Sequence, residues 1–151
     1  MRLPPLLSSR PVGMQILIAN VVPCFFGALC GVLLGVSGLA YIVLSILAIG
    51  GGYVAGLEHR DGAEGALRGV VGGTQFGAMI LLFHELEGSG AKADLPHPAI
   101  LLLVITVGFG ALLGYLGGRV FRDQPIYALL LAFAIAASIT LVVEARRRVR
   151  K

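Results

Sequence analysis

The sequence places few polar side chains inside segments that are apolar enough to cross a membrane, and those few are the candidates for chemistry. Asn20 lies close to Pro23, which removes the backbone N–H that would bond the carbonyl of Ala19 in a regular helix. Thr74 and Gln75 lie together, deep in a later apolar segment. We expect these side chains to hydrogen-bond between helices, and the alternative is that they line a polar path for a small solute or ion.

The charged side chain of Arg68 lies about one turn inside the same later segment. We expect it to extend toward the membrane surface or to pair with Glu64 one turn earlier, and the alternative is anion binding at the membrane interface. No Asp, Glu, Lys or His falls near the middle of any apolar segment. Carriers driven by protons or cations normally place a carboxylate there, so the sequence disfavours that class.

The sequence lacks the motifs of common enzyme classes: it has no P-loop, no Gly-x-Ser-x-Gly elbow and no Cys-x-x-Cys pair. One hydrophilic connection carries several side chains of metal-ligand type, which are His84, Glu85, Glu87, Asp94 and His97. Their order contains no recognised metal-binding spacing such as HExxH, so we interpret them as a solvated acidic loop. The sequence therefore predicts neither an enzyme nor a bound metal or cofactor.

The composition indicates that lipid surrounds most of the chain. Hydrophobic residues make up 57% of the 151 residues and charged residues 13%, where a soluble domain carries about 25%. A soluble fold of this size would lack the polar side chains needed to cover its surface, whereas a bilayer removes that need. The sequence therefore predicts an integral membrane protein.

The net charge of +4 does not indicate nucleic-acid binding, because the basic residues form no face with interleaved aromatic side chains. Five of the twelve basic residues instead follow the last apolar segment, as Arg146, Arg147, Arg148, Arg150 and Lys151. Such a cluster beside a membrane span is typical of an anchor to anionic lipid. The partners that the sequence implies are the lipid bilayer and either further copies of the chain or a larger membrane complex.

Five segments come close to the roughly 20 apolar residues that a membrane-spanning helix needs. They cover residues 14–35, 39–57, 66–83, 99–120 and 125–143. The predicted fold is all-α, with a 1–13 tail, one transmembrane domain over 14–145 and a basic 146–151 tail. The long hydrophilic connection is His84–Pro98. The Asn20–Pro23 region leaves open a re-entrant first segment.

An internal repeat indicates a duplicated helical hairpin. At an offset of 62 residues, Gly52-Tyr53-x-x-Gly56-x-x-x-Arg60-Asp61 matches Gly114-Tyr115-x-x-Gly118-x-x-x-Arg122-Asp123. The two hairpins cover about 39–85 and 101–147, and they repeat in parallel because each contains two spans. We interpret both Arg-Asp pairs as turns on one side of the membrane, with the Arg after one helix and the Asp capping the next.

Small residues recur at every fourth position on all five segments, which places them on one face of each helix. Glycines form this stripe on the first four segments, as Gly27, Gly31, Gly35, Gly52, Gly56, Gly65, Gly69, Gly73, Gly77, Gly110, Gly114 and Gly118. The fifth segment has Ala128, Ala132, Ala136 and Thr140 instead. Such a glycine zipper lets helix backbones approach closely in lipid. The third segment has four of these glycines, so we expect it to be the central packing helix.

Two functions fit this pattern. We favour a non-enzymatic packing, accessory or assembly protein, because buried charge is scarce and glycine stripes are extensive. The alternative is a small oligomeric channel or transporter, with the duplicated hairpins forming a pore around Gln75. Five spans put the termini on opposite sides, and the basic tail predicts a cytoplasmic C-terminus in a prokaryotic plasma membrane. Basic residues are balanced across the two sides, which leaves four spans with a re-entrant first segment, or dual insertion, as alternatives.

Overall fold

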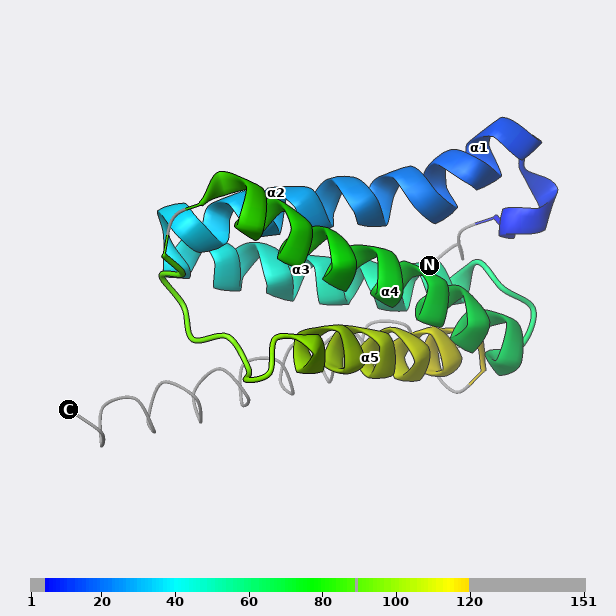
Figure 1. The fold of residues 1–151 in the computed structure, drawn as a ribbon. Coiled ribbons are helices and arrows are strands. Elements are labelled where there is room, and N and C mark those ends of the chain that lie inside the picture. Colours follow the sequence, from blue (N-terminus) through cyan, green and yellow to red (C-terminus); the bar gives the residue numbers. More distant parts are fainter. Residues whose placement is uncertain (1–4, 89, 120–151) are drawn as a thin grey trace.

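A computed structural model describes residues 5–88 and 90–119, and all regular elements of this part of the chain are helical (Figure 1). The N-terminal segment contains a short 3-10 turn, η1 (Leu7–Ser9). A helical stretch follows, made of α1 (Val12–Ile16), the π turn η2 (Leu17–Val21) and α2 (Val22–Val36). Three further long helices complete the described fold: α3 (Gly38–Leu57), α4 (Gly62–Glu87) and α5 (Ile100–Gly118).

Four helical stretches in the described residues are long and apolar enough to cross a membrane. The first, formed by α1, η2 and α2, has 25 residues, and α3, α4 and α5 have 20, 26 and 19. At about 1.5 Å per residue, even the shortest reaches about 28 Å, which nearly equals the hydrocarbon core of a bilayer. They coincide with the first four predicted spans. The predicted fifth span, 125–143, lies outside the described residues, as do Arg122, Asp123 and the basic tail 146–151.

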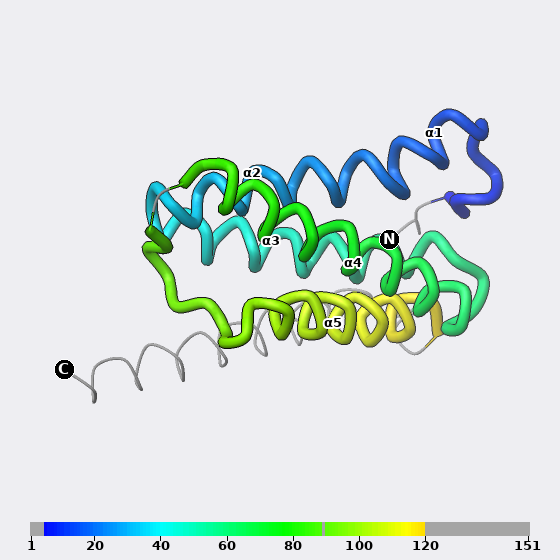
Figure 2. The backbone as a smooth tube through the Cα atoms, in the orientation of Figure 1, coloured from blue at the N-terminus to red at the C-terminus, as the bar shows by residue number. Residues whose placement is uncertain are grey.

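The predicted break in the first segment is a local change of helix type. Pro23 lies in the first turn of α2, directly after the π turn η2. The backbone carries on through this turn without reversing direction, as the tube in Figure 2 shows. The first segment is therefore one stretch, Val12–Val36, with the geometry of a span and not of a re-entrant loop.

α4 is longer than the predicted span 66–83, because it begins at Gly62 and ends at Glu87. Gly88 terminates it with a φ of 71°, a left-handed conformation that glycine adopts without steric cost. The prediction that a loop begins at His84 is therefore wrong. Hydropathy marks only the part of a helix that lies in lipid, whereas the backbone hydrogen bonds continue into the polar interface.

The long helices run alternately up and down, with α4 between α2 and α5 (Figure 2). α4 contacts α2, α3 and α5, and its most extensive contact is with α5. Two apolar clusters fill the interior, one made of Tyr53, Leu57 and Leu113 and the other of Cys30, Leu34, Ile80 and Leu102. The outer faces expose large apolar side chains, among them Phe25, Leu39, Leu67 and Val104. Such a surface suits contact with lipid or with other membrane helices.

Candidate functional site

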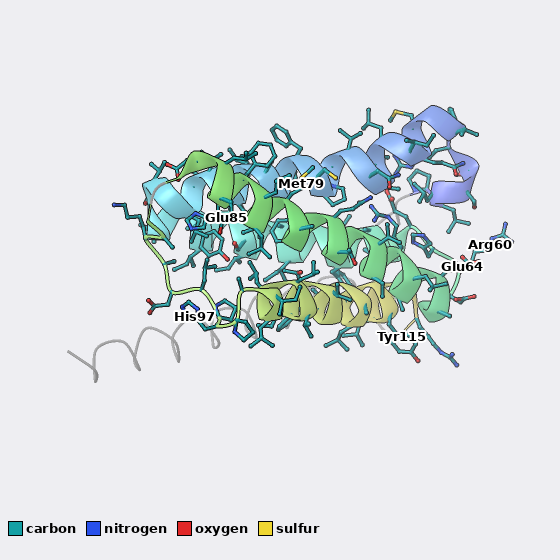
Figure 3. The ribbon with its side chains drawn as sticks, in the orientation of Figure 1. Arg60, Glu64, Met79, Glu85, His97 and Tyr115 are labelled. Carbon is teal, nitrogen blue, oxygen red and sulfur yellow. The ribbon has the colours of Figure 1, made fainter. Side chains whose placement is uncertain are left out.

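An open pocket of about 530 Å³ lies where the N-terminal segment and η2 meet the turn between α3 and α4. Its polar lining includes Gln15, Asn20, Glu58, Arg60, Glu64 and Arg68. Figure 3 shows Arg60 and Glu64 at this end of the bundle, together with Tyr115 of α5. Glu85 and His97 lie at the opposite end. The fold thus gathers charged and amide side chains from three separate stretches of sequence into one site.

Arg68 binds a backbone carbonyl that the first helix cannot satisfy by itself. In η2 the N–H of Val22 donates to the carbonyl of Leu17, five residues back. In the same register the carbonyl of Ile18 would need the N–H of Pro23, which has none. Nη2 of the Arg68 guanidinium donates to this Ile18 carbonyl at 2.8 Å.

This contact corrects two predictions. The sequence predicted that Pro23 frees the carbonyl of Ala19, but the π turn shifts the register by one residue, so the carbonyl that Pro23 leaves without a donor is that of Ile18. Arg68 also turns toward the first helix and does not pair with Glu64. The Glu64 carboxylate instead accepts a hydrogen bond from the backbone N–H of Arg60 at 3.4 Å.

The turn between α3 and α4 is organised by Asp61. Its side chain is the N-cap of α4 and accepts a hydrogen bond from the N–H of Glu64 at 2.9 Å. Arg60, the preceding residue, is exposed and lines the pocket. The first predicted Arg-Asp pair therefore forms the helix-to-helix turn beside the pocket, whereas the second pair, Arg122-Asp123, lies outside the described residues.

The structure brings together two of the three side chains predicted for a polar path. Nε2 of Gln75 donates to Oδ1 of Asn20 at 2.7 Å, and Nδ2 of Asn20 donates to the carbonyl of Ile16 at 3.2 Å. Oε1 of Gln75 is buried and has no hydrogen-bond partner among the described residues. Thr74 lies apart from this pair, because its hydroxyl bonds back to the carbonyl of Val70 at 2.8 Å on an exposed face.

An ion pair that sequence reasoning missed ties the N-terminal segment to the same end of the bundle. Nη2 of Arg10 lies 2.6 Å from Oε1 of Glu58, and the two side chains are 24% and 8% exposed. The N–H of Leu7 also donates to the carbonyl of Glu58 at 2.9 Å, and Nε2 of Gln15 to the carbonyl of Arg10 at 2.8 Å. One signal could have found Glu58: it directly follows α3, where the helix dipole favours a cation and not a carboxylate.

Arg68 forms no ion pair of its own among the described residues. Glu58 is the carboxylate that acts on the Arg68 guanidinium, but Arg10 binds the same carboxylate. The hydrogen-bond partner of Arg68 is a neutral carbonyl. Two guanidinium groups therefore draw on the one carboxylate of Glu58, and the second carboxylate of the pocket lining, Glu64, accepts the backbone N–H of Arg60.

The predicted packing glycines of α4 and α5 meet at backbone distance. They are Gly65, Gly69 and Gly73 on α4 and Gly110 and Gly114 on α5, whereas an added Cβ would meet the Thr106 hydroxyl at Gly77 and the carbonyl of Asp61, just before α4, at Gly118. A Cβ added at Gly69 would overlap the carbonyl oxygen of Gly110, and one added at Gly110 would overlap that of Gly69. No side chain fits between the two helices at this crossing.

α2 approaches the backbone of α4 in a similar way. A Cβ added at Gly27 would lie 2.5 Å from the carbonyl oxygen of Phe76, and one added at Gly31 would lie 2.6 Å from that of Ile80. Gly35, the third residue of this stripe, is also buried. Gly27 and Gly31 thus contact another helix of the same chain.

Of the two α3 glycines that were predicted to pack, Gly56 lies close to another helix, and Gly52 does not among the described residues. A Cβ added at Gly56 would lie 2.5 Å from the carbonyl oxygen of Gly114. At Gly52 an added Cβ would meet nothing within 4 Å among the described residues. Gly52 therefore does not share the close backbone contact that Gly56 makes with α5.

No protein-family model, curated protein or solved structure matches the chain. The described residues define a helical chain with four membrane-length helices and a polar pocket at the turn between α3 and α4. Within residues 5–88 and 90–119, no group of three His, Cys, Asp or Glu side chains is placed to hold a metal ion. What the pocket can do is hydrogen-bond and attract charge through Arg68, Asn20 and their neighbours.

Proposed function

We propose that this chain is a non-enzymatic membrane protein of the packing, accessory or assembly type, built as a five-span glycine-zipper bundle with a duplicated hairpin. The observation that carries the proposal is the approach of α4 and α5 at Gly69 and Gly110, where backbone faces backbone. Helices this close cannot shift past one another without steric overlap, so the bundle acts as a stiff unit in lipid. A stiff unit with apolar outer faces suits a subunit that completes a larger assembly.

The glycine faces are turned toward other helices of the same chain, which supports the same proposal. Gly27, Gly31 and Gly56 contact helices of their own chain, so they are not available to a partner. A partner must instead meet the outer faces, where large side chains such as Phe25 and Leu47 are exposed. Contact through these faces would bury apolar side chains against another membrane protein.

Purification from native membranes in a mild detergent, followed by native mass spectrometry, tests this role. We expect the chain in a complex with the same second membrane protein at a fixed stoichiometry, whichever terminus carries the tag. A monomer that purifies alone would contradict the proposal. A defined homo-oligomer without other proteins would favour the alternative below.

The alternative is a small oligomeric channel or transporter for an ion or small solute. One observation favours it: the Asn20–Gln75 pair lies beside the pocket, and Oε1 of Gln75 has a free acceptor among the described residues. Solute flux into liposomes tests this function, with Gln75→Leu as the variant and Thr74→Val as the matched control. Flux that Gln75→Leu abolishes and Thr74→Val preserves would support it, and the absence of flux in the wild-type protein would refute it.

A further inference from the structure

We propose that the pocket beside the α3–α4 turn binds the phosphate of an anionic phospholipid, with Arg68 as the main contact. The proposal concerns a ligand of the chain and does not depend on whether the chain packs against a partner or conducts a solute. Three observations carry it: the guanidinium that has no ion pair of its own among the described residues, its fixed position, and the apolar wall next to it.

Arg68 has no carboxylate partner of its own among the described residues. Arg68 is half-buried, its hydrogen-bond partner is the neutral carbonyl of Ile18, and the carboxylate of Glu58 is bound by Arg10. A half-buried charge without a full counter-charge is unfavourable in a site of low polarity. A phosphate in the pocket would give Arg68 a direct ion pair.

The guanidinium of Arg68 is held in place before any ligand arrives. Nη2 is fixed by the Ile18 carbonyl at 2.8 Å, and a guanidinium carries four further N–H donors in a planar fork. This geometry matches the oxygens of a phosphate group, which guanidinium groups bind with paired, charge-assisted hydrogen bonds. The contact to Ile18 therefore reduces the conformational entropy that a ligand would otherwise have to offset.

The other wall of the pocket is apolar and faces outward. Leu67 and Val71 line the pocket, are exposed, and lie four residues apart on α4. They therefore form a strip along the helix, next to Arg68 and directed toward the lipid-facing surface. This strip continues the apolar outer surface up to Arg68, so a single phospholipid can place its phosphate at Arg68 and an acyl chain along Leu67 and Val71, whereas a soluble anion contacts Arg68 alone.

The experiment is native mass spectrometry of the full chain in detergent, titrated with phosphatidylglycerol, with phosphatidylcholine as the neutral-headgroup lipid and with inorganic phosphate. We expect the wild-type protein to retain phosphatidylglycerol in preference to phosphatidylcholine. Arg68→Gln should weaken phosphatidylglycerol binding by roughly tenfold or more, the factor that loss of a charge-assisted hydrogen bond corresponds to. The matched control is Arg119→Gln, which removes an exposed cation outside the pocket lining.

Two further variants keep the test decisive if Arg68→Gln fails to fold. Arg68→Lys keeps the charge without the planar fork, so it should keep the lipid preference with lower affinity. Leu67→Ser leaves Arg68 untouched and should weaken retention of phosphatidylglycerol while leaving any response to inorganic phosphate unchanged. Equal retention of the two lipids, or equal loss in Arg68→Gln and Arg119→Gln, would overturn the proposal. Arg68-dependent binding of inorganic phosphate without a lipid preference would also overturn it and would assign the pocket to a soluble anion.

Discussion

At the scale of single residues, Glu58 occupies a position that a helix does not favour. Its carboxylate follows the last residue of α3, where backbone carbonyls already carry partial negative charge, and the side chain is 8% exposed. Arg10 compensates by placing a guanidinium 2.6 Å from the carboxylate. Since the carbonyl of Glu58 also accepts the N–H of Leu7, this residue holds the N-terminal segment against the bundle.

Replacing Glu58 by Gln should therefore loosen the N-terminal segment. The variant Glu58→Gln keeps the shape of the side chain but leaves the Arg10 charge unpaired, and we expect the free energy of unfolding to fall by about 1–2 kcal/mol. Thermal unfolding in detergent measures the stability, and hydrogen exchange at the Leu7 amide measures the loosening. Glu85→Gln, an exposed change at the other end of the bundle, is the control. Equal stability and equal exchange in the two variants would contradict the assigned role of Glu58.

Sequence reasoning found part of this site. Asn20 and Gln75 were predictable because an amide in an apolar segment needs a partner, and the two amides do bond to each other. Arg10 and Glu58 were not, because hydropathy places both outside the spans and their contact joins residues 48 apart. The bond from Arg68 to Ile18 depends on a one-residue shift of helix register that no periodicity reveals.

At the scale of elements, the span positions were largely predictable and the helix ends were not. Hydropathy located α3 and α5 to within about two residues because their ends coincide with the end of the apolar run. Hydropathy predicted too short a segment for α4, because the four residues at each end of that helix include polar side chains such as Glu64 and Glu85. The face that each helix turns inward follows from its neighbours, which explains why Gly56 is in contact and Gly52 is not.

The helix crossings can be tested with a pair of glycine substitutions. Gly69→Ala adds a methyl group that overlaps the Gly110 carbonyl, so α4 and α5 must separate, and we expect a loss of about 2 kcal/mol or more in stability. Gly52→Ala adds the same group where none of the described residues lies within 4 Å, and the higher helix propensity of alanine should leave stability unchanged or raise it slightly. Unfolding in detergent distinguishes them. Similar losses at both positions would mean that the backbone contact at Gly69 is not the cause.

A double-mutant cycle tests whether Arg68 replaces the backbone donor that is missing at the π turn η2. Pro23→Ala restores an N–H at the residue that would serve the Ile18 carbonyl in the register of η2. Arg68→Gln should therefore cost about 1 kcal/mol less stability in the Pro23→Ala background than in the wild-type background. Strictly additive losses would show that the Arg68 contact does not replace a missing backbone donor.

At the scale of the whole molecule, alternating helices put the pocket and the 88–99 connection at opposite ends of the bundle (Figure 1). With the five spans proposed here, the pocket would open on the side opposite to the C-terminus. A cytoplasmic C-terminus would then place the lipid proposed for the pocket in the outer leaflet. Composition predicted the membrane class, but balanced basic residues do not decide the orientation.

Cysteine labelling in intact cells should resolve this orientation. In a background without Cys24 and Cys30, we expect Ser8→Cys and Arg60→Cys to react with a membrane-impermeant maleimide from one side, and Gly90→Cys from the other. With a cytoplasmic C-terminus, the first two should react from outside the cell. Labelling of all three positions from both sides would indicate dual insertion, and labelling of Ser8→Cys and Gly90→Cys from the same side would contradict the arrangement of spans.

The π turn η2 makes two residues that lie far apart in the sequence, Pro23 and Arg68, depend on each other. A turn of this kind corresponds to one extra residue in a helix, and here that extra residue and Pro23 together expose the carbonyl that Arg68 covers. A lineage that lost the extra residue would leave Arg68 without its partner, and one that lost the arginine would leave the Ile18 carbonyl uncovered. We therefore expect descendants of a common ancestor to inherit the length of the first helix and the identity of residue 68 together.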